Sequence, residues 1–222
     1  MLRGRPRLPV LAEISGPSEG ARAWSLRRRD FESLEQALPQ VAAQQVVLVS
    51  GKREAAPVAA IALAAAASAR GRRTILVECD LAQPQLAAYV GLAAAPGLHE
   101  YLRWEAEPAD VLQPVALGGP KASAPAEPLA CVCGGRPASN AETLLGLQSF
   151  AHMIEKLRAA YGLVLLSGPP VLDEPGPFLA VARQADAVVM GLPASAPADR
   201  ALGKAARRLP IPALGVIAVA AE

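Results

Sequence analysis

Apolar residues along this chain gather in short continuous runs that are rich in valine, leucine and isoleucine. The runs cover residues 46–49, 74–77, 129–132, 163–166, 187–190 and 216–219. Runs of about four to six residues, without alternation of polar and apolar positions, are typical of strands buried on both faces of a parallel sheet. We therefore expect each run to form a buried strand.

Longer segments with helical spacing separate these runs. They cover residues 57–70, 84–90, 141–160, 178–184 and 198–208, and Asp30 is placed to cap a further helix over residues 31–38. Strands that alternate with helices predict βαβ units. The predicted fold is α/β, with a single doubly wound, mostly parallel sheet of about six to seven strands flanked by helices.

The ends of this pattern define the expected domain. Residues 1–30 follow neither a helical nor a strand period, and their arginines outnumber their acidic residues, so we predict a basic, flexible leader there. Residues 31–222 then form one α/β domain, with a flexible loop near 118–128, where the sequence reads GGPKASAPAEP.

The composition argues against several classes of protein. The net charge of +2 gives no reason to expect a nucleic-acid partner, and three cysteines fit a cytoplasmic protein better than a disulfide framework. The longest apolar stretch, residues 58–69, is shorter than the roughly 20 residues that cross a bilayer. The basic start is not followed by an apolar segment, so we expect neither a signal peptide nor a membrane span.

The most suggestive local feature is SGKREAAPV, residues 50–58, which joins a predicted strand to a predicted helix. A phosphate-binding loop has this layout, with glycines that turn backbone N–H groups inward, a lysine for the phosphate charge and a hydroxyl for Mg²⁺. The stretch resembles the loop SGKGGVGKTT of the deviant-Walker branch of P-loop ATPases. This branch includes the ParA/MinD partition proteins and the bacterial tyrosine autokinases of capsule and exopolysaccharide synthesis.

The functional groups of that loop are replaced in this chain. Ser50, Gly51 and Lys52 match its start, but Arg53 and Glu54 stand where the family has two glycines, and Ala56 stands at the third. Further along, Pro57 stands at the phosphate lysine and Val58 at the Mg²⁺ hydroxyl. Pro57 cannot donate an N–H, although proline suits the first turn of a helix.

Two downstream segments strengthen the resemblance, which extends over about residues 40–219. Residues 74–102, TILVECDLAQPQLAAYVGLAAAPGLHEYL, are similar to the autokinase pattern VLLIDADLRxPxLHxxFGxxxxxGLxxxL. There Asp80 matches an aspartate that helps to organise Mg²⁺ in the family, and Glu78 matches the first acid of the pair. In SGPP, residues 167–170, Ser167 replaces the Walker B aspartate of the family. In the last predicted strand, Val219 replaces an asparagine that holds the adenine base in the family.

The resemblance therefore implies a fold without its chemistry, and we expect no intact catalytic residue. The degenerate positions are Pro57, Val58 and Ser167, with Asp80 as a residual acid, and the vestigial nucleotide-binding residues are Ser50, Gly51, Lys52, Arg53 and Asp80. No metal or other cofactor is expected. ATP and Mg²⁺ would bind only under the alternative that the chain is an active ATPase or protein tyrosine kinase with an atypical loop.

The implied role is that of a pseudo-ATPase that regulates a membrane-embedded polysaccharide copolymerase or a paralogous active ATPase, within a homo- or hetero-oligomer. Arg27, Arg28 and Arg29 are the expected contact with such a partner or with the inner face of the bacterial inner membrane. Lys52 could reach a neighbouring subunit, and Arg53, Arg70 or Arg72 could bind another anion. A ParA/MinD-like positioning protein is the second alternative.

Overall fold

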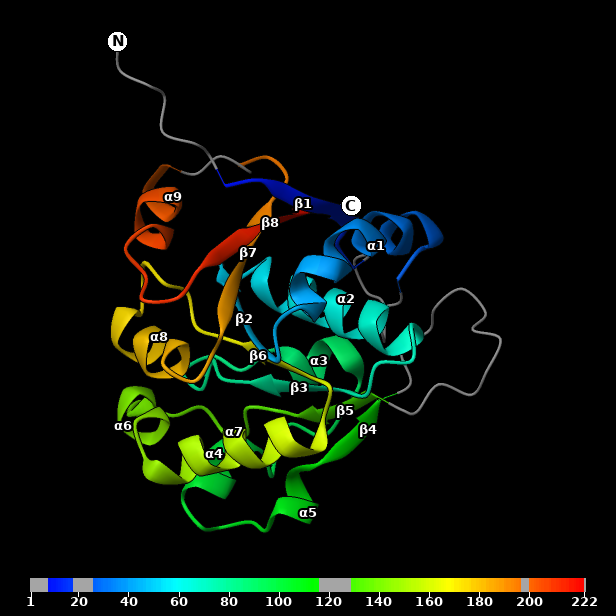
Figure 1. Ribbon diagram of the computed structural model, residues 1–222. Helices are drawn as coiled ribbons and strands as arrows, with labels where there is room; N and C mark the ends of the chain where they lie inside the picture. Colours follow the sequence, from blue (N-terminus) through cyan, green and yellow to red (C-terminus); the bar gives the residue numbers. More distant parts are fainter. Residues whose placement is uncertain (1–7, 18–25, 116–128, 197–199, 222) are drawn as a thin grey trace.

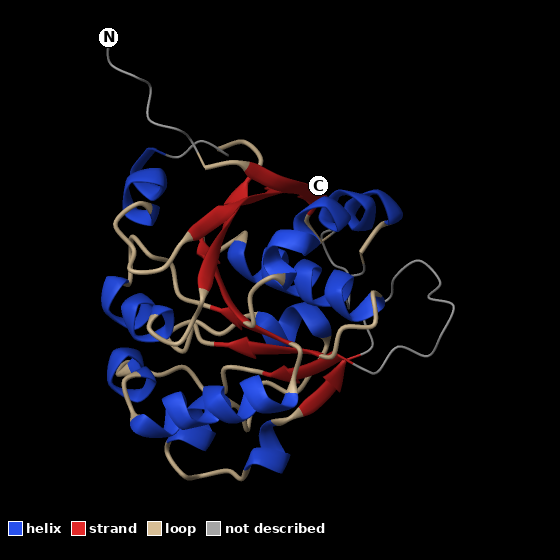
Figure 2. Ribbon diagram, viewed as in Figure 1, coloured by secondary structure: helices blue, strands red, loops and turns tan. Residues whose placement is uncertain are grey.

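The computed structural model describes residues 8–17, 26–115, 129–196 and 200–221, which build helical layers on both faces of one sheet (Figures 1 and 2). The eight strands lie in the order β1-β8-β7-β2-β6-β3-β5-β4, all parallel except β4, which runs antiparallel to β5. The strands are β1 (Val10–Ser15), β2 (Val46–Gly51), β3 (Thr74–Glu78), β4 (Gln113–Val115), β5 (Leu129–Val132), β6 (Leu163–Ser167), β7 (Ala187–Pro193) and β8 (Ala213–Ala220).

The helices divide between the two faces of the sheet. One face is covered by α1 (Arg28–Ala42), α2 (Ala56–Ala69) and α3 (Leu86–Val90). The other face is covered by α4 (Leu98–Leu102), α5 (Pro108–Val111), α6 (Ala141–Leu145), α7 (Gln148–Ala160), α8 (Pro175–Ala182) and α9 (Arg200–Ala206). Successive residues of β2 contribute to opposite cores, as the period of a strand requires.

The predicted α/β class and mostly parallel sheet are confirmed, and all of the expected strands form. Two further strands bring the sheet to eight. β4 is a short edge strand that contains Pro114, and an edge tolerates proline because no ladder bond is lost there. The expected helix over residues 141–160 is instead two helices, since Gly146 ends α6 and Leu147 is extended.

The N-terminal region corrects the predicted domain boundary. Val10–Ser15 is not part of a leader: it forms β1 and pairs in parallel with β8, from Val10 opposite Val216 to Ser15 opposite Ala220. Asp30 is not a helix cap either, because α1 begins at Arg28. Its buried carboxylate instead accepts hydrogen bonds from the backbone N–H and the hydroxyl of Ser15.

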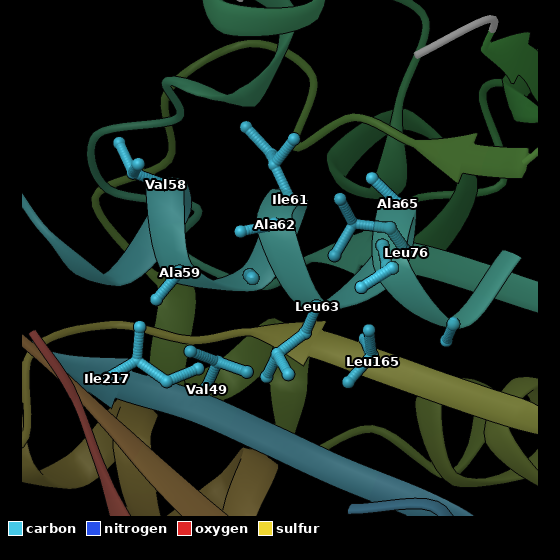
Figure 3. Close-up of a cluster of buried hydrophobic side chains, with 14 of the residues drawn as sticks. Val49, Val58, Ala59, Ile61, Ala62, Leu63, Ala65, Leu76, Leu165 and Ile217 are labelled. Carbon is cyan, nitrogen blue, oxygen red and sulfur yellow. The ribbon is translucent and has the colours of Figure 1, made fainter. Parts of the chain in front are cut away.

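The centre of the molecule is α2, which is buried along nearly its whole length (Figure 3). Its alanines let the helix lie close to the sheet, where Leu63 packs towards Val49 and Leu165. α1 packs against α2 as well, so the helix is enclosed on several sides and is apolar all round.

Two further expectations concern the segments predicted to be flexible and the absence of a membrane-spanning helix. The loop predicted near 118–128 and most of the predicted leader lie outside the described residues. Among the helices that the structure describes, none combines the length and the apolar character that crossing a bilayer requires.

Candidate functional site

The candidate site lies where β2, β6 and β3 end side by side. In doubly wound sheets, ligands bind at the carboxyl ends of the strands, where the strand order reverses. Ser50 and Gly51 end β2, Ser167 ends β6, and Asp80 follows β3 by two residues. The structure thus brings the degenerate Walker positions and the residual acid to one edge of the sheet.

The loop from β2 to α2 is folded on itself. The N–H of Lys52 donates to the carbonyl of Gly191 at 3.0 Å, and the carbonyl of Lys52 accepts from the N–H groups of Ala55 and Ala56 at 3.0 and 2.8 Å. These are backbone groups that a phosphate loop would turn towards its ligand. Pro57 follows with no N–H to offer.

Two glycines allow this loop to pack tightly against β7. Gly51 has a φ of +142°, and a Cβ at this position would collide with the carbonyl oxygen of Gly191. A Cβ on Gly191 would in turn lie 2.7 Å from the Cα of Ala56. The glycine of the SGK sequence therefore serves the close approach of two backbones.

The phosphate-lysine and Mg²⁺-hydroxyl positions are filled by apolar groups at the start of α2. Pro57 is in the first turn, and Val58 is buried with only 1% of its surface exposed. Ser167, at the Walker B position, is buried, and its carbonyl accepts from the N–H of Cys79 at 2.7 Å. None of these three positions offers a carboxylate or an ammonium group.

Arg53 occupies the centre of the site. Its Nη1 donates to Oδ2 of Asp80 at 2.7 Å, and its Nη2 donates to the carboxylate of Glu174. The three side chains are mostly buried, with exposed fractions of 20%, 10% and 22% for Arg53, Asp80 and Glu174. These two ion pairs, which we call the Arg53 bridge, join the β2–α2 loop to the segment after β3 and to the start of α8.

The electrostatics of the bridge follow from burial and pairing. Burial raises the pKa of Asp80, although the Arg53 charge and the N–H of Gln83 act in the other direction. Burial alone would lower the pKa of Arg53, but the hydrogen bond to Glu174 and the charge of Asp80 raise it. Arg53 therefore stays a cation, held between two carboxylates.

Glu78, which matches the first acid of the family pair, is not part of the Arg53 bridge and bonds to backbone groups instead. Its Oε1 accepts from the N–H groups of Gln85 and Leu86, and its Oε2 accepts from the N–H of Gly134 at 2.8 Å. Burial raises the pKa of Glu78 even with these bonds. The carboxylate holds the start of α3 to the end of β5, so it has a structural role.

Ser50 is also used within the protein, because its hydroxyl donates to the carbonyl of Pro169 at 2.6 Å. Lys52 lies half-buried at the start of the loop, and its predicted reach to a neighbouring subunit stays a prediction. Glu174 is the site residue that the motifs did not identify. The one signal in the sequence is the acidic pair Asp173–Glu174 in the segment after SGPP.

The other predicted cations lie outside the site. Arg28 pairs with Glu32 at 3.0 Å, and Arg29 lies beside Asp30 at the start of α1, so the structure leaves their predicted membrane contact untested. Arg70 pairs with Glu35. Arg72 donates to the carbonyl oxygens of Ala42, Gln44 and Gly162, at the opposite edge of the sheet.

Comparisons with known proteins agree with this description of the fold. No protein-family model and no curated protein sequence matches the chain. Among solved structures, the cell division ATPase MinD of Pyrococcus furiosus has a TM-score of 0.60 at 17% identity, over 78% of this chain and 71% of that one. The protein thus has the fold of the deviant-Walker P-loop ATPases.

Within this class the structure is similar to bacterial tyrosine kinase domains. The kinase domain of Escherichia coli tyrosine kinase ETK has a TM-score of 0.76 at 16% identity, over 96% of this chain and 91% of that one. The chimeric protein CapA2B2 has a TM-score of 0.76 at 21% identity, over 96% and 94%. At these identities the likeness establishes the fold.

Proposed function

We propose that the protein is a pseudo-ATPase: a non-catalytic relative of the bacterial tyrosine kinases that acts by binding a partner in exopolysaccharide or capsule synthesis and export. The observation that carries the proposal is the Arg53 bridge. An internal cation neutralises Asp80, the carboxylate that Mg²⁺ would need, so a metal would have to displace the guanidinium.

The groups around the Arg53 bridge also argue against binding of Mg-ATP. Mg-ATP would also have to open the turn at Lys52 and would meet Pro57 and Val58 in place of a lysine and a hydroxyl. A buried charge-stabilising group is worth on the order of 2–4 kcal/mol, and several are missing together. Negligible affinity for ATP and negligible turnover follow.

A protein that has this fold but does not catalyse a reaction would act by binding another molecule through its surface. The structural likeness to tyrosine kinase domains favours a partner in the same kind of system. Two partners fit: a membrane-embedded polysaccharide copolymerase, or a paralogous active ATPase with which the protein forms a hetero-oligomer. Either places it on the cytoplasmic side of the bacterial inner membrane.

Calorimetric titration of the purified protein with Mg-ATP tests the loss of catalysis. We expect no saturable binding at millimolar nucleotide, in the wild type and equally in Lys52→Ala and Asp80→Ala. Micromolar binding that either substitution abolishes would overturn the proposal and favour an active ATPase or tyrosine kinase. Nucleotide-dependent dimers in size-exclusion chromatography would instead favour a ParA/MinD-like positioning protein.

Genetic complementation tests the role in polysaccharide synthesis. Deleting the gene should lower the yield of exopolysaccharide or capsule, and the wild type and Lys52→Ala should restore it equally, because no turnover is required. An unchanged yield after deletion would contradict the assignment to this system. Failure of Lys52→Ala alone, at wild-type protein levels, would show that the loop has an active role.

A further inference from the structure

Trp104 differs from the other apolar residues of the described chain because its side chain lies almost wholly in solvent. It follows the end of α4, and 83% of its surface is exposed. Leu112 and Leu179, which are also on the surface, are exposed to 43% and 40%. The large apolar area of the indole is therefore almost unused in the packing of the folded chain.

The backbone at Trp104 has the conformation that normally selects glycine. α4 ends in two hydrogen bonds, from the N–H of Trp104 to the carbonyl of Tyr101 at 3.0 Å and from the N–H of Glu105 to the carbonyl of Glu100 at 2.9 Å. This is a Schellman motif, in which the residue after the C-cap is left-handed and is usually glycine. Trp104 takes that place with a φ of +63°. A Cβ is strained in this region, so tryptophan costs stability where glycine would not.

Ion pairs hold the segment around Trp104 in place. Arg103 pairs with Glu105 at 2.6 Å, and Arg136 pairs with Glu105 at 2.6 Å and with Glu100 at 2.8 Å. The indole is thus presented to solvent from a fixed support. Tryptophan is enriched at the centres of protein interfaces, and backbone strain is concentrated at functional positions. A strained, exposed tryptophan therefore points to a contact with another molecule.

A groove elsewhere on the molecule has the size and the lining that an indole requires. It lies between α1 and the end of α2, and we call it the α1–α2 groove. Its volume is about 380 Å³, within the range of roughly 300–1,000 Å³ that is common for ligand sites. Its apolar lining is formed by Leu38, Pro39, Ala42 and Ala67.

The polar residues of the α1–α2 groove complement both the N–H and the ring face of an indole. Glu35 lines the groove, and its carboxylate has acceptor sites beyond its ion pair with Arg70. The indole N–H is a donor only, so it suits such an acceptor. Arg70 already lies over the ring of Phe31 at 6.0 Å, and a guanidinium stacks readily on an aromatic face.

Trp104 and the α1–α2 groove lie on opposite sides of the sheet, so one molecule cannot fill its own groove. α4 and α5 cover one face of the sheet, whereas α1 and α2 cover the other (Figure 1). The two surfaces also differ in charge. Residues 103–110 include one arginine and three acids, whereas the groove is lined by two arginines and one acid. Arg136 beside the segment is matched by Glu100, so the difference remains.

We propose that two copies of this chain associate by insertion of Trp104 of one copy into the α1–α2 groove of the other. The apolar lining, the acceptor for the indole N–H and the opposite net charges are all present on the same chain, which makes a second copy the matching partner. The contact is heterologous, because the two surfaces differ, and each pair keeps one unused Trp104 and one unused groove. It uses no residue of the Arg53 bridge and does not depend on the absence of catalysis.

Sedimentation equilibrium over a range of micromolar concentrations tests the proposal on the purified chain. We expect the wild type to associate with rising concentration. Trp104→Gly should weaken the association at least about thirtyfold, the loss that is typical of a tryptophan at the centre of an interface. Its melting temperature should rise by about 1–4 °C, because glycine suits the left-handed position. Unfolding therefore cannot account for the loss of association.

A second variant blocks the other half of the contact. Ala42→Gln places a longer, uncharged side chain over the apolar lining of the α1–α2 groove and should also weaken the association. Each variant keeps one intact surface, so a mixture of Trp104→Gly and Ala42→Gln should form mixed pairs with nearly the wild-type affinity. The matched control, Leu179→Ser, removes an exposed apolar side chain of α8 and should associate as the wild type does.

Four results would overturn the proposal. They are a wild type that stays monomeric at the highest concentration, a Trp104→Gly variant that associates like the wild type, a mixture of the two variants that stays monomeric, and equal loss of association in Leu179→Ser. If Ala42→Gln associates normally while Trp104→Gly does not, Trp104 binds a different surface and the assignment of the groove is wrong.

Discussion

Arg53 connects segments that are far apart in the sequence, and its partner Glu174 is 121 positions away. Because the guanidinium is held between two carboxylates in a mostly buried site, the three charges depend on one another. Removing the cation leaves two acids facing each other where water is largely excluded.

We expect Arg53→Ala to lower the free energy of unfolding by about 2–3 kcal/mol, less than for a fully buried pair because the site is partly exposed. Urea denaturation at pH 7 measures this. The matched control is Arg103→Ala, which removes an exposed arginine paired with Glu105 and should cost under about 1 kcal/mol. If both variants lost the same unfolding free energy, the Arg53 bridge would contribute no more to stability than an exposed ion pair. Adding Asp80→Asn to Arg53→Ala should recover part of the loss.

Asp186 gives the stability a pH dependence of known sign. Burial acts to raise its pKa, but the hydrogen bonds from Arg158 and from the N–H of Val46 lower the pKa below the ordinary value of 3.8 for this side chain. A lowered pKa in the folded state stabilises the protein above the unfolded pKa, and the contribution is lost as pH falls through the folded value. Asp80, whose pKa is raised, acts in the opposite direction.

Asp186→Asn should therefore destabilise the protein at pH 7 by about 1–2 kcal/mol. The difference from the wild type should shrink as pH falls below 3.8, where the wild-type carboxylate also becomes protonated. Urea titrations over this range measure both effects. A difference that stays constant with pH would show that the lost contact is not ionic.

The sequence indicated where some residues of the site lie, but not which of them are in contact. The motifs located Arg53 and Asp80, since both follow recognisable strands. They could not pair the two residues, because the contact depends on how the ends of β2 and β3 are spaced in the sheet. Glu78 was matched to the first acid of the family's acidic pair, yet it accepts hydrogen bonds from three backbone N–H groups, an arrangement that depends on the loops around it.

Elements were predicted where hydrophobic runs were continuous. β1 was missed because its sequence, VLAEIS, includes Glu13 and lies between segments rich in arginine, proline and glycine. Its strand conformation depends on pairing with β8, which is more than 190 residues further along the chain. Long-range pairing of this kind leaves little trace in the local pattern.

The contribution of β1 can be measured with a matched pair of substitutions. Ile14 is 2% exposed in the core, whereas Val10 in the same strand is 49% exposed. Ile14→Ala should cost about 2–4 kcal/mol of unfolding free energy and Val10→Ala under about 1. If residues 10–15 were a leader, both changes would have negligible effect, so chemical denaturation distinguishes the two descriptions.

At the scale of the whole molecule, the frame of a P-loop ATPase is kept while the side chains at its phosphate-loop and Walker B positions are replaced. Strand order, the buried α2 and the position of the loop are determined by extensive packing, which tolerates change at a few loop positions. The nucleotide site depends instead on a handful of groups at one edge. The two can therefore be separated, and the loss should be reversible.

Restoring the missing groups should restore nucleotide binding. The repaired chain carries Arg53→Gly, Glu54→Gly, Ala56→Gly, Pro57→Lys, Val58→Ser and Ser167→Asp. We expect it to fold with some loss of stability, because Arg53→Gly removes the Arg53 bridge, Val58 is buried, and glycine weakens the helix start. Mg-ATP at a hundred times the dissociation constant should then stabilise it by about 2.7 kcal/mol, seen as a rise in melting temperature.

The control is the same repaired chain with Pro57 retained, which lacks the phosphate lysine and should show no shift. The wild type should show none either. A repaired chain that folds but is not stabilised by Mg-ATP would mean that the close packing of the loop on Gly191, rather than the absent side chains, excludes the nucleotide. In that case the backbone of the loop would itself have to change before Mg-ATP could bind, and restoring side chains alone is not sufficient.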